Sequence, residues 1–428
     1  MSDYTGRLAC VRCGTQVDAV APWTGCPACA RDGVHANVLP TYGAGTTDAA
    51  APDPTQPGIF RYRQRLPLAA DVTPVSLAEG NTPLVPTPDL GASLGVGALW
   101  FKDETRNPTW SYKDRLAAMA ITDARARGAK TVALATTGNH GAATAAYAAA
   151  AGLRCVVLTL ESVPLTMKVL MQSYGAEVVA LRTGPERWQL LRQAVDAWGW
   201  VPVSGFLDPP LGSNPFGIDG YKTIAFELHE QLGDVPDAVV VPSAYADGLA
   251  GVQRGFADLA ELGVTSRQPR LIAVDPFGAY AAAMDAETRV LPRVAAGASV
   301  SFSIATPTAT HQGVAALRAS DGAAAGPFDD QATIDAQLRI ARRTGLYLEA
   351  SSATTLLAVE QLVARGELDG DSRVVCLATS TGLKDIATTA QRLPDVPVID
   401  PDLDQLARYL EVSEDRTPVS RFSAEVAP

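Results

Sequence analysis

Residues 107–115 (Asn-Pro-Thr-Trp-Ser-Tyr-Lys-Asp-Arg) decide how the rest of this 428-residue chain is interpreted. Ser111 is of a type that caps helices, and Asp114 stands three residues later, where a carboxylate complements the positive end of a helix. Leu116, Ala120 and Ala124 then recur at helical spacing. The pattern predicts a helix with Lys113 in its first turn and one buried face, so this lysine is directed into the fold.

Composition gives Lys113 further weight. Only six of the 35 basic residues are lysines, so the chain supplies its surface charge with arginine. A lone lysine at a helix start is usually an ordinary solvated residue, and that interpretation stays open. A lysine kept against this bias favours a need for an amine that can lose its proton, which arginine cannot provide.

The segment resembles the Asn-Pro-Thr-Gly-Ser-Phe-Lys-Asp-Arg motif of the threonine synthase branch of fold-type II pyridoxal-phosphate (PLP) enzymes. The resemblance extends over roughly residues 75–390 and includes a Glu-Gly-x-Thr-Pro-Leu entrance at residues 79–84. It implies that Lys113 forms the Schiff base with PLP. Trp110 and Leu116 stand where the family has glycine, which predicts a bulkier wall near the lysine.

Size and charge limit the class of protein. With 428 residues, 47% of them hydrophobic, the chain can form two domains with substantial cores. The net charge of −11 disfavours a nucleic acid or an anionic membrane as partner. The chain has no apolar run of transmembrane length and no signal-peptide pattern. We expect a soluble, cytoplasmic protein with neither a nucleic-acid nor a membrane partner.

Four of the six cysteines lie close to the N-terminus, as two Cys-x-x-Cys pairs separated by twelve residues. This spacing is typical of a structural zinc site in which every ligand is a thiolate. Two disulfides or free thiols are the alternatives, and a reducing compartment favours zinc. Similar ribbons occur on some threonine synthase-like proteins. The expected Zn²⁺ ligands are Cys10, Cys13, Cys26 and Cys29.

The chain divides by composition. We expect a zinc ribbon over 1–39 and a linker over 40–58, where four prolines and three glycines interrupt any apolar period. A PLP-dependent catalytic region follows over 59–394, with two subdomains of which the smaller covers roughly 114–210. The polar segment 395–428 is a C-terminal extension.

Within the catalytic region, short apolar runs alternate with helical stretches, which predicts an α/β fold with strands buried on both faces. The resemblance makes this a fold-type II PLP enzyme of two open α/β domains with mainly parallel sheets. The expected strands are 131–135, 155–160, 177–181, 238–241, 271–274 and 374–378.

Residues 136–141 (Thr-Thr-Gly-Asn-His-Gly) follow a predicted strand and open an alanine-rich helix, where backbone N–H groups point toward an anion. They resemble the family's Ser-Ser-Gly-Asn-Thr-Gly loop. The resemblance implies that Asn139 hydrogen-bonds the PLP phenolic oxygen and that Thr136, Thr137 and His140 receive the substrate carboxylate. Taken alone, a histidine here favours packing or solvent contact over catalysis.

Two later segments resemble other cofactor contacts of the family. The strand-to-helix turn after residue 241 corresponds to the loop that cradles the PLP phosphate, although taken alone it is a plain turn, and Asp247 would have to face away from the phosphate. Thr379 corresponds to the threonine at the pyridine nitrogen. The residues expected to form the cradle are Ser243, Ala244, Tyr245, Ala246 and Gly248.

Residues 213–223 resemble the family's Asn-Pro-x-Arg-x-Glu-Gly-x-Lys-Thr segment, with Gly217 in place of the arginine that helps to hold the substrate phosphate. Loss of a guanidinium that binds through two parallel hydrogen bonds argues against tight binding of O-phosphohomoserine. Lys168 is expected to compensate in part for the missing arginine as a phosphate ligand.

The resemblance implies a threonine synthase-like lyase that eliminates phosphate from Cγ of O-phosphohomoserine and adds water to give threonine. Gly217 keeps PLP-dependent β-elimination or β-replacement on another substituted amino acid as an alternative. A cofactor-free zinc-ribbon protein with a binding or regulatory role is the non-enzyme alternative. Dimers are common in the family, so a homodimer is a possible assembly.

Overall fold

The computed structural model describes residues 2–286 and 288–411. The chain divides into two units, with the boundary after Thr388. The first unit contains two open sheets and a small N-terminal sheet, and it carries every feature of the site described below.

The larger sheet has six strands in the order β12-β11-β10-β13-β5-β4. Neighbouring strands are parallel except for the edge pair β4 and β5, which is antiparallel. Its strands are β4 (Leu84–Pro86), β5 (Ala98–Asp103), β10 (Ala238–Pro242), β11 (Arg270–Val274), β12 (Ala323–Ala325) and β13 (Arg373–Ala378).

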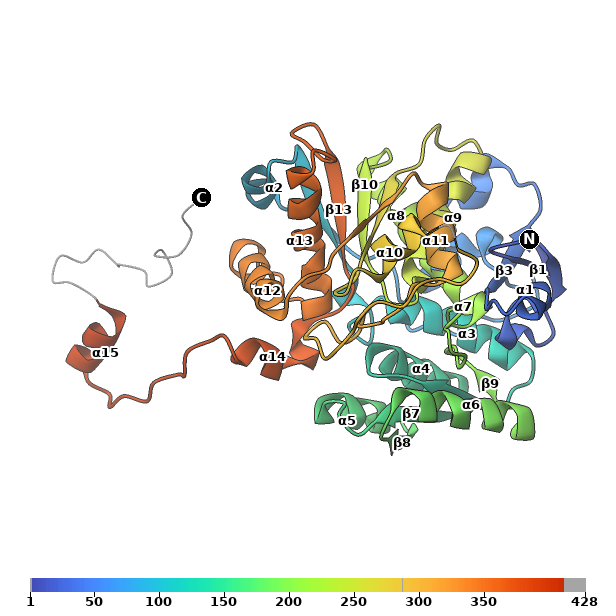
Figure 1. Cartoon of the computed structure of the whole chain (residues 1–428), viewed down its shortest axis with the longest axis horizontal. Coiled ribbons are helices and arrows are strands. Elements are labelled where there is room, and N and C mark those ends of the chain that lie inside the picture. The colour runs from blue at the N-terminus through green and yellow to red at the C-terminus, as the bar shows by residue number, and fades with distance from the viewer. Residues whose placement is uncertain (1, 287, 412–428) are drawn as a thin grey trace. The chain divides into compact units, whose positions relative to one another are not determined.

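Helices cover both faces of this sheet (Figure 1). Along β10, Val240 packs into a core with one helical layer, whereas Val239 and Val241 pack into the core on the other face. The first layer contains α2 (Pro88–Leu94), α12 (Asp330–Thr344) and α13 (Ala350–Ala364). The second contains α8 (Lys222–Leu232), α9 (Asp247–Glu261) and α11 (His311–Ala319), and α10 (Ala279–Asp285) lies against α11 and β12.

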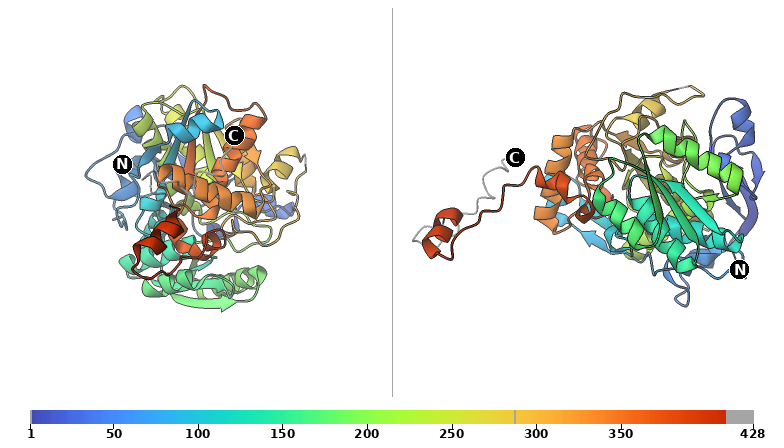
Figure 2. Two further views of the ribbon diagram at one scale, coloured as in Figure 1. Left: turned by 90° about the vertical axis from the view of Figure 1, so that its left-hand side faces the viewer. Right: turned by 90° about the horizontal axis from the view of Figure 1, so that it is seen from below.

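The smaller sheet has four parallel strands in the order β8-β7-β6-β9. Figure 2 (left) shows its green elements as a layer apart from the larger sheet. Its strands are β6 (Thr131–Ala135), β7 (Arg154–Leu160), β8 (Glu177–Leu181) and β9 (Val201–Pro202). The helices packed with it are α4 (Asn139–Ala151), α5 (Leu165–Ser173) and α6 (Gly184–Trp198), and α3 (Lys113–Ala126) packs on α4 and α7 (Pro215–Ile218).

The six predicted strands are confirmed as β6, β7, β8, β10, β11 and β13. The two mainly parallel sheets are confirmed as well. Strands β4, β9 and β12 were not predicted because two or three residues carry too little pattern. Strand β5 was missed because Lys102 and Asp103 interrupt its apolar run.

The N-terminal segment forms a three-stranded antiparallel sheet of β1 (Tyr4–Cys10), β2 (Gln16–Asp18) and β3 (Val38–Tyr42), with the short helix α1 (Pro27–Arg31). Part of the predicted linker is ordered, because β3 runs to Tyr42 and a 3-10 helix spans Thr47–Ala50. Ala49 and Ala50 are buried there, since small side chains let this segment pack into the main core.

The predicted C-terminal extension contains α15 (Leu403–Leu410), and α14 (Ile386–Ala390) spans the boundary between the units. Residues 412–428 of that extension lie outside the described residues. Across the described ranges 2–286 and 288–411, no helix has the length and apolar character needed to span a membrane.

Candidate active site

Helix α3 begins at Lys113, as predicted. Its start is not capped by Ser111, however, because the helix has no side-chain cap and the Ser111 hydroxyl has no partner among the described residues. Instead Ser111 forms a β-bridge with Ser380, and the Tyr112 N–H donates to the Thr379 carbonyl at 2.9 Å. The end of β13 therefore holds the lysine segment in place.

Arg115 anchors the same segment from within α3. Its guanidinium is fully buried and donates to both Glu104 and Glu227 at 2.7–2.8 Å, and it also contacts Thr82 and Thr223. A buried guanidinium is stable only when its donors are satisfied in this way. These contacts join the entrance segment, the 3-10 helix Glu104–Arg106 that follows β5, and α8 to the lysine motif.

Two further residues of the motif also hold its shape. The Asp114 carboxylate accepts from the N–H and hydroxyl of Thr109 at 3.1 and 2.9 Å. Burial raises the pKa of Asp114 to about 7. Asn107 accepts from the Gly80 N–H at 2.9 Å and donates to Glu104 at 2.8 Å. Most residues of the motif thus fix the backbone that carries Lys113.

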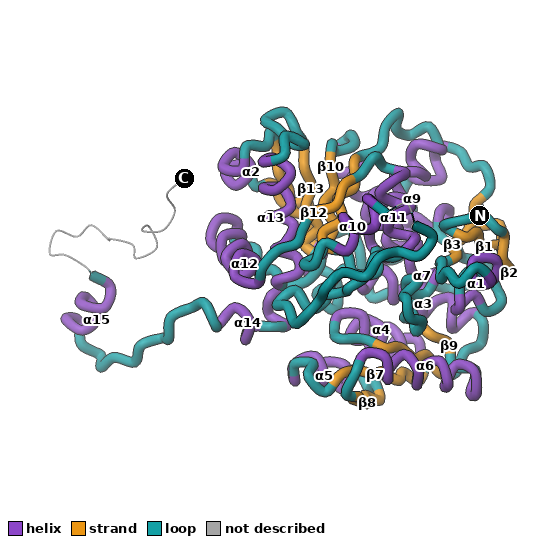
Figure 3. The backbone as a smooth tube through the Cα atoms, in the orientation of Figure 1, coloured by secondary structure: helices purple, strands orange, loops and turns teal. Residues whose placement is uncertain are grey.

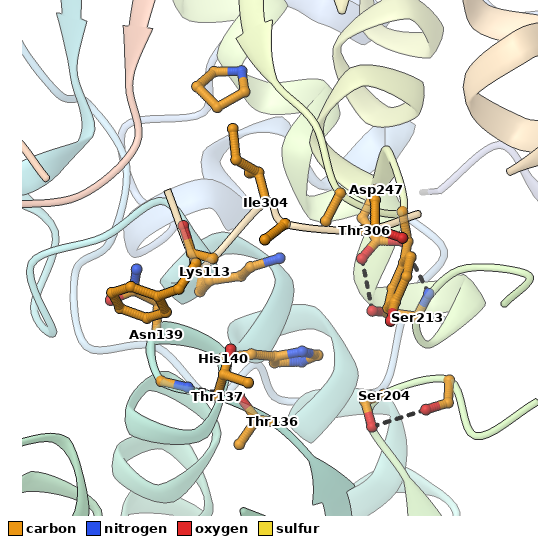
Figure 4. A pocket seen from close by; sticks show the side chains of 18 of the residues that line it. Lys113, Thr136, Thr137, Asn139, His140, Ser204, Ser213, Asp247, Ile304 and Thr306 are labelled. Atoms are coloured by element: carbon orange, nitrogen blue, oxygen red, sulfur yellow. Dashed lines mark hydrogen bonds between the residues drawn. The ribbon is translucent and has the colours of Figure 1, made fainter. Parts of the chain in front are cut away.

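The Lys113 amine extends into a cavity of about 190 Å³, toward the space between Ile304 and His140 (Figure 4). Its Nζ lies 5.0 Å from the ring centre of Tyr112 and 5.8 Å from that of Tyr221. Within the described residues, no carboxylate lies within ion-pair distance of Nζ. This amine is available to a ligand.

The cavity brings together predicted residues from four distant segments. It also gathers residues that the sequence did not single out, some of them from the long loop between α10 and α11. Figure 3 shows the course of this loop. The predicted residues that line it are Lys113, Thr136, Thr137, Asn139, His140, Ala244, Tyr245, Ala246 and Thr379. The lining residues without a predicted role include Arg187, Trp188, Ser204 and Phe302 to Thr306.

The turn before α4 offers free donors at a helix N-terminus. The N–H groups of Thr137, Asn139 and His140 have no acceptor among the described residues. The Thr136 N–H is used by the Leu158 carbonyl, and its hydroxyl accepts from Gly138, so Thr136 offers only its hydroxyl to a ligand. Together with the helix dipole, the free amides form a site for a carboxylate.

His140 is buried beneath Lys113 (Figure 4). Burial, with the nearby positive Lys113, holds the pKa of His140 well below its usual range. Its Nε2 has no partner among the described residues. A neutral imidazole here adds no positive charge beside the lysine.

Asn139 is oriented at both ends of its side-chain amide. Its Nδ2 donates to Glu349 at 2.9 Å, and its Oδ1 accepts from Lys384 at 2.7 Å and from Ser380 at 3.2 Å. Burial raises the pKa of Glu349 and lowers the pKa of Lys384 to about 8. The Thr379 hydroxyl lies 2.7 Å from that of Ser352, so it is positioned as well.

The turn before α9 has the geometry of an anion cradle. The carbonyls of Ala244 and Tyr245 accept hydrogen bonds from Tyr280, Thr310 and Gln312. Because a trans peptide points its N–H opposite to its carbonyl, the following amides are turned away from those partners. The N–H groups from residue 244 to residue 248 have no acceptor among the described residues. Ala246 has a left-handed φ of 59°, which curls these amides into a nest.

Ser243 and Gly248 do not line the cavity, although both were predicted to contribute to the cradle. The Ser243 hydroxyl donates back to the Val241 carbonyl at 2.8 Å. A Cβ at Gly248 would lie 2.7 Å from the Tyr112 ring, so this glycine is needed for packing. The Asp247 carboxylate is held by Ser213 at 2.6 Å, and by two further donors from that residue and Gln312.

Lys168 lies outside the cavity, so the structure does not bring it to the place where compensation was expected. Its Nζ donates to the Glu161 carbonyl on an exposed edge. The two departures at Leu116 and Gly217 contact each other instead, because a Cβ at residue 217 would lie 2.9 Å from Leu116 Cγ. The leucine occupies the space into which a side chain at 217 would extend.

The four N-terminal cysteines converge at one point. All four sulfurs lie within 4.8 Å of one another, three of the Sγ···Sγ distances are 3.6–3.7 Å, and none of the four is in a disulfide. Backbone amides at residues 12 and 13 donate to Cys10, and that of Cys29 donates to Cys26, as in zinc knuckles. The donor set fits a tetrahedral thiolate site for zinc.

Comparison with known families decides which cofactor this cavity serves. Residues 75–380 match the family described as "Pyridoxal-phosphate dependent enzyme". The chain belongs to that family. The nest before α9, the lysine amine and the oriented Asn139 fit the phosphate, aldehyde and phenolic groups of PLP, so the donor set agrees with the match.

The chain is similar to threonine synthases. It is 32% identical over 361 residues to that of Methanocaldococcus jannaschii, covering 83% of this chain and 87% of the relative. It is also 32% identical to the threonine synthase of Mycobacterium tuberculosis, covering 81% and 94%. The solved threonine deaminase isoform 2 of Solanum lycopersicum shares the fold, with a TM-score of 0.61, 20% identity and coverage of 72% and 86%.

Proposed function

We propose that this PLP-dependent enzyme is a threonine synthase-like lyase that eliminates phosphate from O-phosphohomoserine and adds water to give threonine. The observation that carries the proposal is the meeting of Lys113, Asn139 and Thr379 at one cavity. These residues come from three distant segments. They meet in a chain that matches threonine synthases over four-fifths of its length.

The residues that would hold PLP follow from their donors. Lys113 would attach it through the amine, and Asn139 and Thr379 would bind the two polar edges of the ring. The amides from 244 to 248 would bind the phosphate. When bound, PLP withdraws the electron pair left at Cα after a proton is removed.

The remaining steps belong to the protein. The amides of Thr137, Asn139 and His140 bind the substrate carboxylate, which places Cα near Lys113. Once the substrate amine has replaced it, the freed Lys113 amine, which has no carboxylate partner among the described residues, would take the proton from Cα. Neutral His140 leaves that amine the principal base of the site.

The contact between Leu116 and Gly217 favours a second candidate. Because the leucine fills the space of an arginine at 217, the chain lacks that phosphate ligand, which supports β-elimination or β-replacement on another substituted amino acid. Both reactions begin with removal of the Cα proton by the same lysine. They then differ, because a group on Cγ leaves only after a second proton is lost from Cβ, whereas a group on Cβ leaves directly.

The visible absorbance of the purified enzyme tests the proposal, with free phosphate and threonine assayed after addition of O-phosphohomoserine. We expect the absorbance of lysine-attached PLP in the wild type, its loss in Lys113→Ala, and its retention in the matched control Lys168→Ala, which removes a lysine outside the cavity. Phosphate and threonine formed only when Lys113 is present support the proposal. If the wild type shows the absorbance but releases no phosphate, the second candidate, β-elimination or β-replacement on another substituted amino acid, is favoured.

Three further proposals accompany this function. We propose that the ribbon cysteines hold a structural zinc ion, that the enzyme acts in the cytoplasm, where thiolates stay reduced, and that it forms a homodimer. We propose limits of the catalytic region at residues 58 and 394, whereas the sheet of the ribbon continues through β3 to Tyr42, past the expected limit at residue 39.

A further inference from the structure

Arg187 is a buried cation without an ion-pair partner in the wall of the cavity. Only 7% of this residue is exposed, and its Nε and Nη1 have no hydrogen-bond partner among the described residues. Within the same residues, no carboxylate forms an ion pair with it. Burial lowers the pKa of the guanidinium, yet a guanidinium keeps its charge in proteins. An uncompensated buried charge is costly, so this one requires an anion.

The fold holds Arg187 in place. Helix α6 begins with a capping box formed by Thr183 and Glu186, which fixes the first turn immediately before Arg187. Arg187, Leu191 and Ala194 are the buried residues of this helix, so the arginine occupies a position that packing alone would give to an apolar side chain. Its guanidinium lines the same cavity as Lys113.

The other anions of the expected ligands already have donors. The amides before α9 suit the cofactor phosphate, and those before α4 suit the substrate carboxylate. The position at Gly217 is closed by Leu116, and Lys168 lies outside the cavity. Arg187 is therefore the arginine in the cavity wall that remains available for a third anion, besides the cofactor phosphate and the substrate carboxylate.

We propose that Arg187 binds an acidic group on the side chain of the substrate and so makes the enzyme selective for α-amino acids with a phosphate or carboxylate at that end. This inference rests on the proposed PLP chemistry but not on the identity of the product. Ser204 and Trp188 line the cavity with it. A guanidinium suits such a role because its fork donates two parallel hydrogen bonds to an oxyanion.

The test compares the holoenzyme with Arg187→Met, Arg187→Lys and the control Arg192→Met. Arg192 lies on the same helix, and its side chain is 58% exposed beside Asp196. Dissociation constants are measured from the visible spectrum for O-phospho-L-homoserine and L-homoserine, which differ only in the phosphate. The pairs O-phospho-L-serine with L-serine and L-glutamate with L-norvaline extend the series. Melting temperature and the PLP dissociation constant are measured for every variant.

We expect Arg187→Met to weaken binding of the preferred acidic ligand about 10- to 100-fold, the range of charge-assisted hydrogen bonds, and to leave its neutral counterpart unchanged. Arg187→Lys keeps part of the preference, and Arg192→Met resembles the wild type. Folding is retained because the methionine removes an unpaired buried charge. If Arg187→Met fails to fold, Arg187→Lys is compared with the wild type instead, because lysine keeps the positive charge but cannot donate two parallel hydrogen bonds.

Two results would overturn the inference. In the first, the wild type binds no acidic ligand more tightly than its neutral counterpart. In the second, Arg187→Met weakens PLP binding while the ratio between acidic and neutral ligands stays the same, which would assign the guanidinium to the cofactor phosphate. The proposed function fails separately, if O-phospho-L-homoserine binds through Arg187 but no phosphate or threonine is formed.

Discussion

Arg115 and Arg187 are both buried, but their surroundings are opposite. Arg115 makes six hydrogen bonds to Glu104, Glu227, Thr82 and Thr223, whereas Arg187 has no ion-pair partner in the described part of the chain. The first joins segments of the scaffold beneath Lys113, and the second lines the cavity. A buried charge whose donors are all paired belongs to the scaffold, and one that is unpaired beside a cavity indicates a ligand.

The lysines divide in the same way. Lys102 pairs with Glu227 at 2.7 Å, and Lys222 pairs with Asp258, and both are fully buried. The Lys113 amine lies near the rings of Tyr112 and Tyr221 and has no carboxylate partner among the described residues. The two cations that we assign to ligands are thus the two lining the cavity without a carboxylate partner among the described residues.

The largest effect is expected from breaking the paired group at Glu227. Glu227→Gln leaves Arg115 and Lys102 without their shared carboxylate, which costs about 3–5 kcal/mol of unfolding free energy. The matched control Glu230→Gln, on the same helix but one-third exposed, should cost about 0–1 kcal/mol. Urea unfolding measures both. If both variants lost the same unfolding free energy, the buried carboxylate of Glu227 would matter no more than the part-exposed one of Glu230, which would contradict the comparison.

Hydrogen bonds connect the ribbon, with its proposed zinc site, to the cavity. Asn37, at the start of β3, donates to Gln312 at 2.9 Å, and Gln312 donates to Asp247 at the nest before α9. Removal of zinc by a chelator should therefore weaken PLP binding as well as unfold the ribbon. Asn37→Ala with zinc retained should cost about 1–3 kcal/mol and reproduce part of the weaker PLP binding. Zinc loss without any change in the PLP dissociation constant would disprove this coupling.

Lys384 adds a pH dependence that is intermediate in size. Its folded pKa of about 8 lies below the ordinary value of 10.5, so between these values the unfolded state binds more protons. Stability should therefore rise with pH across this window, by an amount on the order of 1–3 kcal/mol from this group. Lys384→Met should remove that rise, as measured by urea unfolding of both proteins from pH 7 to pH 10.5. The same slope in both proteins would exclude Lys384 as its source.

The smallest effect concerns Trp110, which has a left-handed φ of 59° at the position where the motif that this segment resembles has glycine. Trp110→Gly removes the steric cost of a side chain in this conformation, so we expect a gain of about 1 kcal/mol. Thermal unfolding measures it, with Trp198→Gly in α6 as a control that should lose stability. A loss at residue 110 would mean that the indole packs more favourably than its backbone is strained.

Much of this organisation was predictable from the sequence. The buried strands could be predicted because parallel strands covered on both faces are apolar throughout. Lys113, Asn139 and Thr379 could be singled out because each lies in a motif whose order along the chain is kept. The grouping of the four cysteines could be predicted because their spacing is specific to thiolate knuckles.

The rest depended on contacts between distant residues. Arg187 is one arginine among many in a helical pattern, and no spacing shows that its side chain lies in a cavity while Lys168 lies outside. The meeting of Leu116 with Gly217 likewise joins residues about a hundred positions apart. Ser111 was expected to cap α3, but pairing with Ser380 across the fold replaced that local contact.

The unfolding free energies of Arg115→Met and Arg187→Met, measured side by side in urea, test the central claim most directly. We predict that Arg115→Met loses about 3–5 kcal/mol because it strands two buried carboxylates, and that Arg187→Met keeps or gains stability because it removes an unpaired charge. A loss at Arg187 as large as that at Arg115 would contradict the account, since the cavity arginine would then be part of the scaffold.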